Sequence, residues 1–212
     1  MYKEINIRIG KFELMDTFNT KESWYTTRLQ RLERKNWKVF LDVQRPFRTP
    51  VLKLKLGKTL EIGCGIGRVL QWLPDSCGVD HNPFSIEAAR TRGLIAFTND
   101  EFHSTSNAVI DSFDSIVMAH LLEHLSSEQI DTLFFEFRKY LKPNGRLLVI
   151  CPQEAGYHSD STHINFVDFK TIESLGEKHG FEVISMKSNP FPRFFGRIFR
   201  YNEFFVLLRS IR

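Results

Sequence analysis

The chain has 212 residues, of which 42% are hydrophobic and 25% are charged. This composition excludes a globally disordered chain, and the length favours one α/β domain over two full domains. The formal net charge is +4, which is too small an excess to indicate by itself a nucleic acid or an anionic substrate as partner.

The three cysteines show neither disulfide nor metal-binding spacing. Cys64, Cys77 and Cys151 form no Cys-x-x-Cys pair and leave an odd count, so we expect no disulfide framework. No apolar run is long enough to span a bilayer, and the first residues lack the apolar core of a signal peptide. We therefore expect no membrane span and a cytoplasmic location.

The N-terminal part is predicted to be helical. Apolar residues recur at roughly helical spacing among lysines and arginines over residues 20–45. Pro46 and Pro50 are expected to end this helix, because proline lacks the backbone N–H that a helix interior needs. We therefore predict an N-terminal helical extension over residues 1–50 and the main domain over residues 51–212.

From residue 58 onward, predicted strands and helices alternate. Short apolar segments predict strands at 59–63, 77–80, 94–97, 113–119, 146–151, 181–186 and 203–209. Amphipathic segments predict helices at 68–73, 83–92, 128–141 and 168–179, and a turn is predicted at 142–145. This order predicts an α/β fold with a doubly wound, mostly parallel, seven-stranded sheet and helices on both faces.

A glycine-rich turn links the first predicted strand to the helix that follows. Residues 60–67 read LEIGCGIG, and their glycines allow a tight turn and a close approach of a ligand to the backbone. The G-x-G-x-G spacing departs from the G-x-G-x-x-G of dinucleotide-binding folds, which disfavours a nicotinamide oxidoreductase. Glu61, two residues before the first glycine, would repel a pyrophosphate but could pair with a cationic cofactor. Asp80 ends the second predicted strand, where an acid can accept both hydroxyls of a ribose.

Four segments resemble, in order, the motifs of class I S-adenosylmethionine-dependent methyltransferases. They read TLEIGCGIG, GVDHN, FDSIVMAHLLEHL and LKPNGRLLVICP, within a match of about residues 58–188. The third resembles the ubiquinone-biosynthesis O-methyltransferase type, which has a run M-L-E-H where this chain has residues 121–124. The chain departs from that type at His120, where its members usually have an acid. The resemblance implies a Rossmann-like methyltransferase domain over residues 51–212.

The resemblance also implies S-adenosylmethionine as cofactor and S-adenosylhomocysteine as its product. Residues implied for the methionine part are Glu61, Gly63, Gly65 and Gly67, with Cys64 inside the turn as a small packing residue. Asp80 would hold the ribose, and His81 and Asn82 would flank the adenosine. Asn99 or Asp100 would contact the adenine amine, and Ala119 and His120 would line the cofactor from the end of the fourth strand.

Two histidines are candidates for a catalytic base, because an imidazole can take a proton near neutral pH. His163 is the first choice, with Asp160 and Tyr157 as helpers, since it follows the fifth strand at the ligand-binding edge of such a sheet. His124 is the alternative. Residues 120–124 also match the H-x-x-E-H pattern of some zinc proteases. That pattern needs a helix and here begins where a strand ends, so we expect no metal site.

Two loops are expected to lie on the substrate side, at about residues 152–167 and 189–202. The second is rich in phenylalanine and arginine, and could cap an acceptor pocket or form the contact of a homodimer. The function predicted is methylation of a small molecule (a metabolite, glycan or lipid precursor), at oxygen. A nucleic-acid methyltransferase is the first alternative, disfavoured because no N/D-P-P-Y/F tetrad follows the fourth strand. A non-catalytic cofactor-binding module of the same fold is the second.

Overall fold

The computed structural model describes Ser23, Thr26, Thr27 and residues 44–212. Most of the helix predicted over residues 20–45 therefore lies outside the described residues. Within the described part of the chain, no helix is long and apolar enough to cross a membrane.

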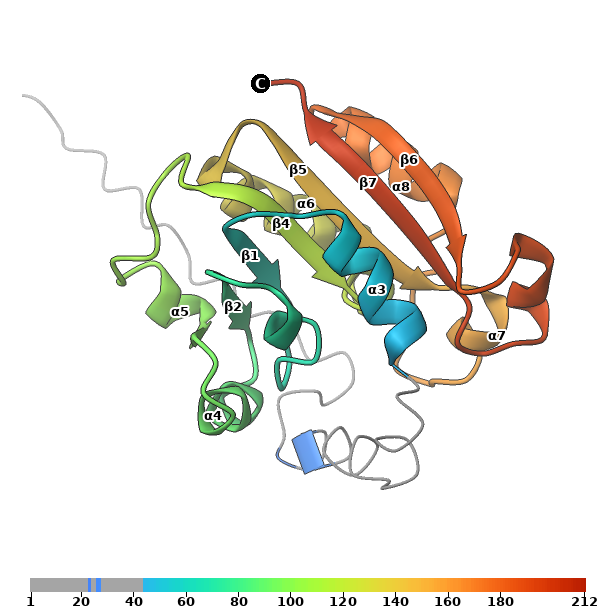
Figure 1. The fold of residues 1–212 in the computed structure, drawn as a ribbon, viewed down its shortest axis with the longest axis horizontal. Helices are drawn as coiled ribbons and strands as arrows, with labels where there is room; N and C mark the ends of the chain where they lie inside the picture. Colours follow the sequence, from blue (N-terminus) through green and yellow to red (C-terminus); the bar gives the residue numbers. More distant parts are fainter. Residues whose placement is uncertain (1–22, 24–25, 28–43) are drawn as a thin grey trace, which may run out of the picture.

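A seven-stranded sheet, in the order β3-β2-β1-β4-β5-β7-β6, runs through the described part of the protein (Figure 1). Its strands are β1 (Thr59–Ile62), β2 (Cys77–Asp80), β3 (Ala96–Thr98), β4 (Phe113–Ala119), β5 (Leu141–Pro152), β6 (Phe181–Asn189) and β7 (Glu203–Ser210). The first five are parallel, and β7 is antiparallel to both β5 and β6. The prediction of a doubly wound, mostly parallel α/β sheet is confirmed.

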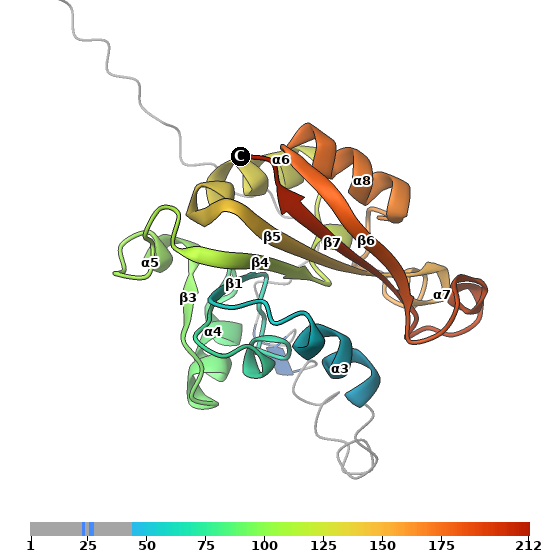
Figure 2. The same ribbon diagram turned by 45° about the horizontal axis from the view of Figure 1, so that its top comes forward.

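Helices cover both faces of this sheet (Figure 2). The α-helices are α3 (Arg45–Lys53), α4 (Pro83–Thr91), α5 (Asn99–Phe102), α6 (Ser127–Phe137), α7 (Glu154–Tyr157) and α8 (Phe169–Lys178). Single 3-10 turns are η1 (Leu70–Trp72), η2 (Leu122–His124), η3 (Arg138–Tyr140) and η4 (Arg193–Arg197). Apolar side chains of α6 and α8 form one core with one face of the sheet, and Val51 of α3 packs into a second core on the opposite face.

The prediction that Pro46 and Pro50 end a helix is wrong, because both lie inside α3. Pro46 is in the first turn, where a backbone N–H has no partner in the helix. Pro50 leaves the carbonyl oxygen of Pro46 without a helical donor, and the side chain of Asn189 donates to it instead, at 3.3 Å. The boundary predicted between residues 50 and 51 consequently falls inside α3.

The turn predicted at residues 142–145 is a bulge within β5. On β4, Phe113 and Ser115 are two residues apart, but their partners Leu141 and Arg146 on β5 are five apart. The extra residues include Asn144 at a φ of 58°, a left-handed conformation that asparagine tolerates. The helix predicted to run to residue 141 ends earlier, at Phe137, and the helix predicted over 68–73 is only the turn η1.

Candidate active site

The glycine-rich turn after β1 lies against the end of β2. Gly63, Gly65 and Gly67 have φ values of 72°, 50° and 80°, a region that residues with a side chain rarely occupy. The backbone N–H groups of Gly63 and Cys64 donate to the carbonyl of Val79 at 2.8 and 3.1 Å. The turn is thus fixed at the carboxyl edge of the sheet, where open α/β folds bind ligands.

Asp80 joins this turn to the start of α4. Its Oδ2 accepts the backbone N–H of Gly65 and its Oδ1 that of Asn82, each at 2.8 Å. Each carboxylate oxygen has a further lone pair for a ligand, so Asp80 can hold the glycine turn and still accept ribose hydroxyls. The ring of His81 is next to it, with Nδ1 3.4 Å from Oδ1.

Glu61 is buried on β1 and fits a cationic ligand group. Its side chain is 2% exposed, and no residue that the structure describes donates a hydrogen bond to its Oε2. Burial raises the pKa of this carboxyl well above its ordinary value, and the nearby Asp80 raises it further. An unpaired buried carboxylate destabilises a fold unless a positive group compensates it. The α-ammonium of S-adenosylmethionine is such a group, and the same cofactor carries a ribose for Asp80.

The side chains of two other residues that were predicted to contact the cofactor have structural roles. The Cys64 thiol packs in a small core with Leu70, Ile86 and Ala89, and burial raises its pKa well above the ordinary value. It is therefore an inert packing group, and only its backbone can serve a ligand. The Asn82 side chain caps α4 by accepting the backbone N–H groups of residues 84 and 85.

The adenine-side candidates begin a short helix that the sequence did not predict. Asn99 and Asp100 are the first residues of α5, directly after β3, so they lie at the same edge of the sheet as the glycine turn. Thr98 and Glu101 form a capping box at the start of this helix. Asn99 is partly buried and Asp100 is exposed.

The end of β4 holds a positive charge that the sequence did not reveal. Ala119 is buried, and His120 follows it at a φ of 54°. His120 Nε2 lies 2.9 Å from Oε1 of Glu203, and its Nδ1 lies 3.4 Å from Oε1 of Glu123. Desolvation lowers the pKa of His120, but the two carboxylates outweigh it and raise the pKa to about 10. The two carboxylates therefore favour the protonated form of His120, which makes this ring a poor candidate for the base.

The two candidate bases, His124 and His163, lie together. Their ring centroids are 4.8 Å apart in an edge-to-face arrangement. Nδ1 of His124 is 3.1 Å from the carbonyl oxygen of Thr162, and Nδ1 of His163 is 2.8 Å from that of Tyr157. A carbonyl only accepts, so each Nδ1 carries the hydrogen, and in the neutral form of each ring Nε2 has the lone pair. Burial lowers the pKa of His124, which keeps this ring neutral.

Glu123 completes a cluster with these two histidines. It is 0% exposed, and among the described residues neither of its side-chain oxygens finds a hydrogen-bond partner. Burial raises the pKa of Glu123, but His120 and His124 outweigh it and lower the pKa below the ordinary value. One ligand atom each from Glu123, His124 and His163 lie within 4.8 Å of one another. These residues could hold a metal ion, although the sequence led us to expect no metal site.

Asp160 shapes the loop that carries His163. Its Oδ1 accepts the backbone N–H of Thr162 at 3.1 Å and the hydroxyl of the same residue at 2.8 Å. The Thr162 carbonyl in turn fixes His124. Asp160 therefore acts on the loop backbone, and Tyr157, which stacks on His163 with ring centroids 5.7 Å apart, contributes its ring and its carbonyl.

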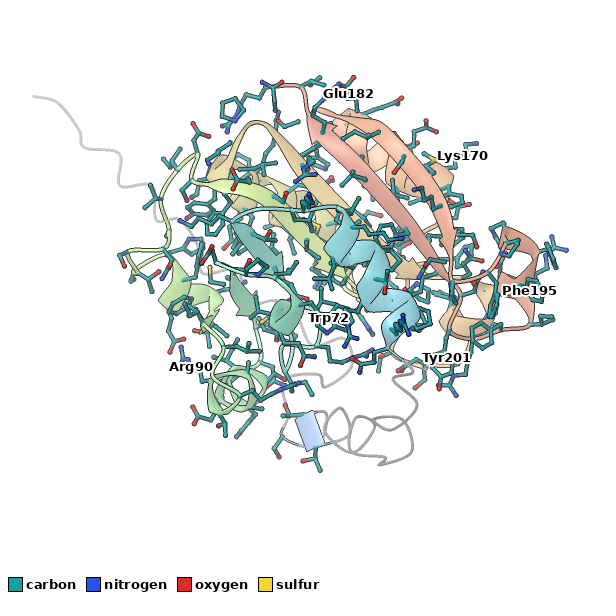
Figure 3. The ribbon with its side chains drawn as sticks, in the orientation of Figure 1. Trp72, Arg90, Lys170, Glu182, Phe195 and Tyr201 are labelled. Carbon is teal, nitrogen blue, oxygen red and sulfur yellow. The ribbon has the colours of Figure 1, made fainter. Side chains whose placement is uncertain are left out.

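The two predicted substrate-side loops meet at this edge of the sheet. The β6–β7 loop projects beyond the strands and carries Phe195 and Tyr201 (Figure 3). Arg193 in this loop donates through both terminal nitrogens to Glu154, which follows β5, and it lowers the pKa of that carboxyl. The Arg193 guanidinium also lies 4.8 Å from the ring centroid of Phe204. Phe194 and Ile198 are left 66% and 76% exposed.

Several solved structures share this arrangement of strands and helices. A Thermotoga maritima S-adenosylmethionine-dependent methyltransferase, described as a possible histamine N-methyltransferase, is 20% identical, with a TM-score of 0.62 over 89% of this chain and 99% of its own. Magnesium protoporphyrin IX methyltransferase from Synechocystis, with bound S-adenosylhomocysteine, is 12% identical, with a TM-score of 0.64 over 90% and 96%. A putative methyltransferase from Haloferax volcanii, in complex with the Trm112 activator, is 16% identical, with a TM-score of 0.67 over 91% and 96%.

The sequence matches the model of one protein family, described as a methyltransferase domain, over residues 41–186. No curated protein matches the chain. The family match covers most of the sheet, including the glycine turn, Asp80 and the His124–His163 pair. The Thermotoga protein is described as S-adenosylmethionine-dependent, and the Synechocystis structure holds S-adenosylhomocysteine. The chain belongs to the methyltransferase domain family and is an S-adenosylmethionine-dependent methyltransferase.

Proposed function

We propose that the enzyme methylates an oxygen of a small-molecule acceptor, which binds at the carboxyl edge of the sheet beside His124 and His163. S-adenosylmethionine supplies a methyl group that is already activated by its sulfonium. The protein has to hold the acceptor oxygen in line with that methyl group and to accept its proton. A metabolite, a glycan or a lipid precursor would each present such a hydroxyl.

The observation that carries this proposal is the fixed tautomer of the two histidines. Each Nδ1–H is used by a backbone carbonyl, so both Nε2 lone pairs are available to a ligand. A hydroxyl must lose its proton to become a strong nucleophile, and a neutral imidazole nitrogen is suited to take it. A neutral amine already has a lone pair, so a site for amines has less need of such a base.

We assign the base to His163 and keep His124 as the alternative. His163 lies on the connection after β5, between α7 and α8. Tyr157 stacks on its ring and Asp160 orders the loop before it, so its orientation is supported on two sides. His124 is held by the carbonyl of Thr162 and lies in the same cluster as Glu123.

The projecting β6–β7 loop supports a small acceptor. Its salt bridge to Glu154 closes this loop onto the connection that carries His163, and its exposed Phe194 and Ile198 offer an apolar wall. A site bordered by this loop favours a compact molecule over a nucleic-acid duplex. The basic N-terminal segment, which kept a nucleic acid as an alternative, lies outside the described residues.

A product screen tests the proposal. The protein is incubated with S-adenosylmethionine and with separate pools of phenols, sugars, hydroxylated lipid precursors, amines and RNA, and S-adenosylhomocysteine release is measured by mass spectrometry. We expect release with a hydroxylated small molecule, and the methyl group on oxygen by NMR. Turnover confined to amines or to RNA contradicts the proposal. The absence of S-adenosylhomocysteine binding in calorimetry rules out cofactor use altogether.

A further inference from the structure

Glu123, His124 and His163 come from two connections that follow neighbouring strands. Glu123 and His124 are on η2 after β4, and His163 lies on the loop after β5. Their ligand atoms lie within 4.8 Å of one another. We propose that these three side chains bind one divalent transition-metal cation. This site goes beyond the methyl transfer proposed above.

The two imidazoles are already arranged as metal ligands. Each donates its Nδ1–H to a backbone carbonyl, that of Thr162 for His124 and that of Tyr157 for His163. This second hydrogen bond is the one that metal-binding histidines usually make, because it fixes the ring and directs the Nε2 lone pair toward the ion. Within the described part of the chain, neither Nε2 has a hydrogen-bond partner.

Glu123 supplies a negative charge that the surrounding structure does not fully compensate. Its carboxylate is completely buried and neither oxygen accepts a hydrogen bond from a described residue. The nearest positive group is His120, whose Nδ1 is 3.4 Å from Oε1. That distance is too long for a good charge-assisted hydrogen bond. A cation bound between Glu123 and the two histidines would satisfy the carboxylate.

The donor set indicates the type of metal. Two neutral imidazoles and one carboxylate suit Zn²⁺, Mn²⁺, Fe²⁺ or Co²⁺ better than Ca²⁺ or Mg²⁺, which prefer oxygen ligands. Two ligands bound at about 2.1 Å from one ion can lie at most about 4.2 Å apart. The widest pair in the cluster therefore has to approach by about 0.6 Å for ligands on opposite sides of the ion and by about 1.4 Å for a tetrahedral site, which ring rotations and the loop that carries His163 can provide.

Three protein ligands leave coordination positions open, as catalytic metal sites do. An acceptor hydroxyl bound in one of them would release its proton to the solvent more easily, because a metal ion lowers the pKa of a bound oxygen. Whether the two histidines act as bases or as metal ligands then depends on whether the ion is bound. An Nε2 that binds the ion cannot also take a proton, so in the metal-loaded protein the pair would act as ligands and not as free bases.

Metal binding can be measured without an acceptor. The full chain, without an affinity tag, is treated with a chelator, dialysed, and titrated separately with Mn²⁺, Zn²⁺ and Co²⁺ in a calorimeter. The visible absorption of bound Co²⁺ reports nitrogen ligation. We expect one ion per chain, and we expect Glu123→Gln, His124→Ala and His163→Ala each to weaken its affinity by at least roughly 100-fold. His158→Ala is the matched control, since His158 is exposed on the same loop, and it should bind the ion like the unmodified protein.

Binding of S-adenosylhomocysteine and thermal unfolding, measured on every variant, show whether each is folded. A wild-type protein that binds none of the three ions at millimolar concentration overturns the proposal. Equal weakening in His158→Ala and His163→Ala also overturns it, because the ion would then be held by surface histidines. If S-adenosylhomocysteine binds and the metal ions do not, the metal site fails while the proposed methyl transfer stands. If the metal ions bind and S-adenosylhomocysteine does not, the metal site stands while the proposed methyl transfer fails.

Discussion

The rings of His124 and His163 lie edge to face with their centroids 4.8 Å apart, although one follows β4 and the other follows β5. They meet because β4 and β5 are parallel neighbours, so the connections that leave them emerge at the same edge of the sheet. The glycine turn after β1 and Asp80 at the end of β2 lie at this edge too. The cofactor side and the acceptor side of the site are therefore set by the order of the strands.

Replacing His163 should affect turnover and leave cofactor binding intact. We expect His163→Ala to lower kcat by roughly 10²–10⁴-fold, whether the ring acts as a base or as a metal ligand, because both roles concern the acceptor. The affinity for S-adenosylhomocysteine, measured by calorimetry, should match that of the unmodified protein. His158→Ala serves as the control with unchanged turnover. A His163→Ala enzyme of normal kcat would remove His163 from the active site and favour His124.

Asp80 should matter for both the cofactor and the turn that holds it. Its carboxylate accepts the backbone N–H groups of Gly65 and Asn82, each at 2.8 Å. Asp80→Ala removes these acceptors and the ribose contact, and hydrogen bonds to a charged group contribute about 1.5–3 kcal/mol each. We expect S-adenosylhomocysteine binding to weaken at least about 10-fold and the melting temperature to fall. Asp80→Asn keeps one acceptor oxygen, so its affinity for S-adenosylhomocysteine should lie between those of Asp80→Ala and the wild type. Equal affinity in all three proteins would contradict the ribose assignment.

Gly65 and Gly93 allow a matched test of the glycine turn. Both have positive φ values, 50° and 79°, so an alanine at either position costs roughly 1–2 kcal/mol of backbone strain. A Cβ on Gly93 would meet no atom within 4 Å, and Gly93 lies outside the glycine turn, between α4 and β3. We expect similar losses of stability in Gly65→Ala and Gly93→Ala, but weaker S-adenosylhomocysteine binding only in the first. Equal affinities would place the cofactor elsewhere.

In the protein without cofactor, Glu61 should make the free energy of unfolding depend on pH. Burial raises its folded-state pKa well above the ordinary value of 4.5, so the folded state holds this proton more tightly than the unfolded state does. Its contribution to stability is therefore present at low pH and is lost as pH rises from about 4.5 through the raised pKa. We expect Glu61→Gln to have a higher free energy of unfolding at pH 7 and a flatter pH dependence in urea denaturation. Its affinity for S-adenosylmethionine should fall, since the ammonium loses a charged partner. A Glu61→Gln protein less stable than the wild type at pH 7 would contradict this assignment.

The sequence was sufficient for the fold because the decisive signals are local. The apolar strand before residue 63, the glycines at positive φ and the acid at the end of β2 are all read within short windows. The bulge in β5 and the helix that contains Pro46 and Pro50 were not predicted. Both depend on partners far along the chain, β4 for the bulge and Asn189 for the carbonyl of Pro46.

The candidate site was predictable only where it follows the strand pattern. Glu61 and Asp80 were identified from their places beside the glycine turn. Glu203, which pairs with His120, is 83 residues away from it in the chain and is brought there by the antiparallel pairing of β7 with β5. Its signal was faint: a single acid at the start of an otherwise apolar strand. The same long-range pairing makes His120 a fixed cation, a property that its sequence neighbours do not indicate.

The position of β7 between β5 and β6 has a consequence for the order in which the protein is assembled. Among the described strands, β7 is the one that pairs with β6, and β6 is synthesised before it. Until β7 follows, both β6 and β5 present an unpaired edge to other chains. The arrival of β7 also delivers Glu203 to His120. One late strand thus covers the aggregation-prone edges and also supplies a carboxylate that raises the pKa of His120, and a nascent chain stalled before residue 203 would have neither.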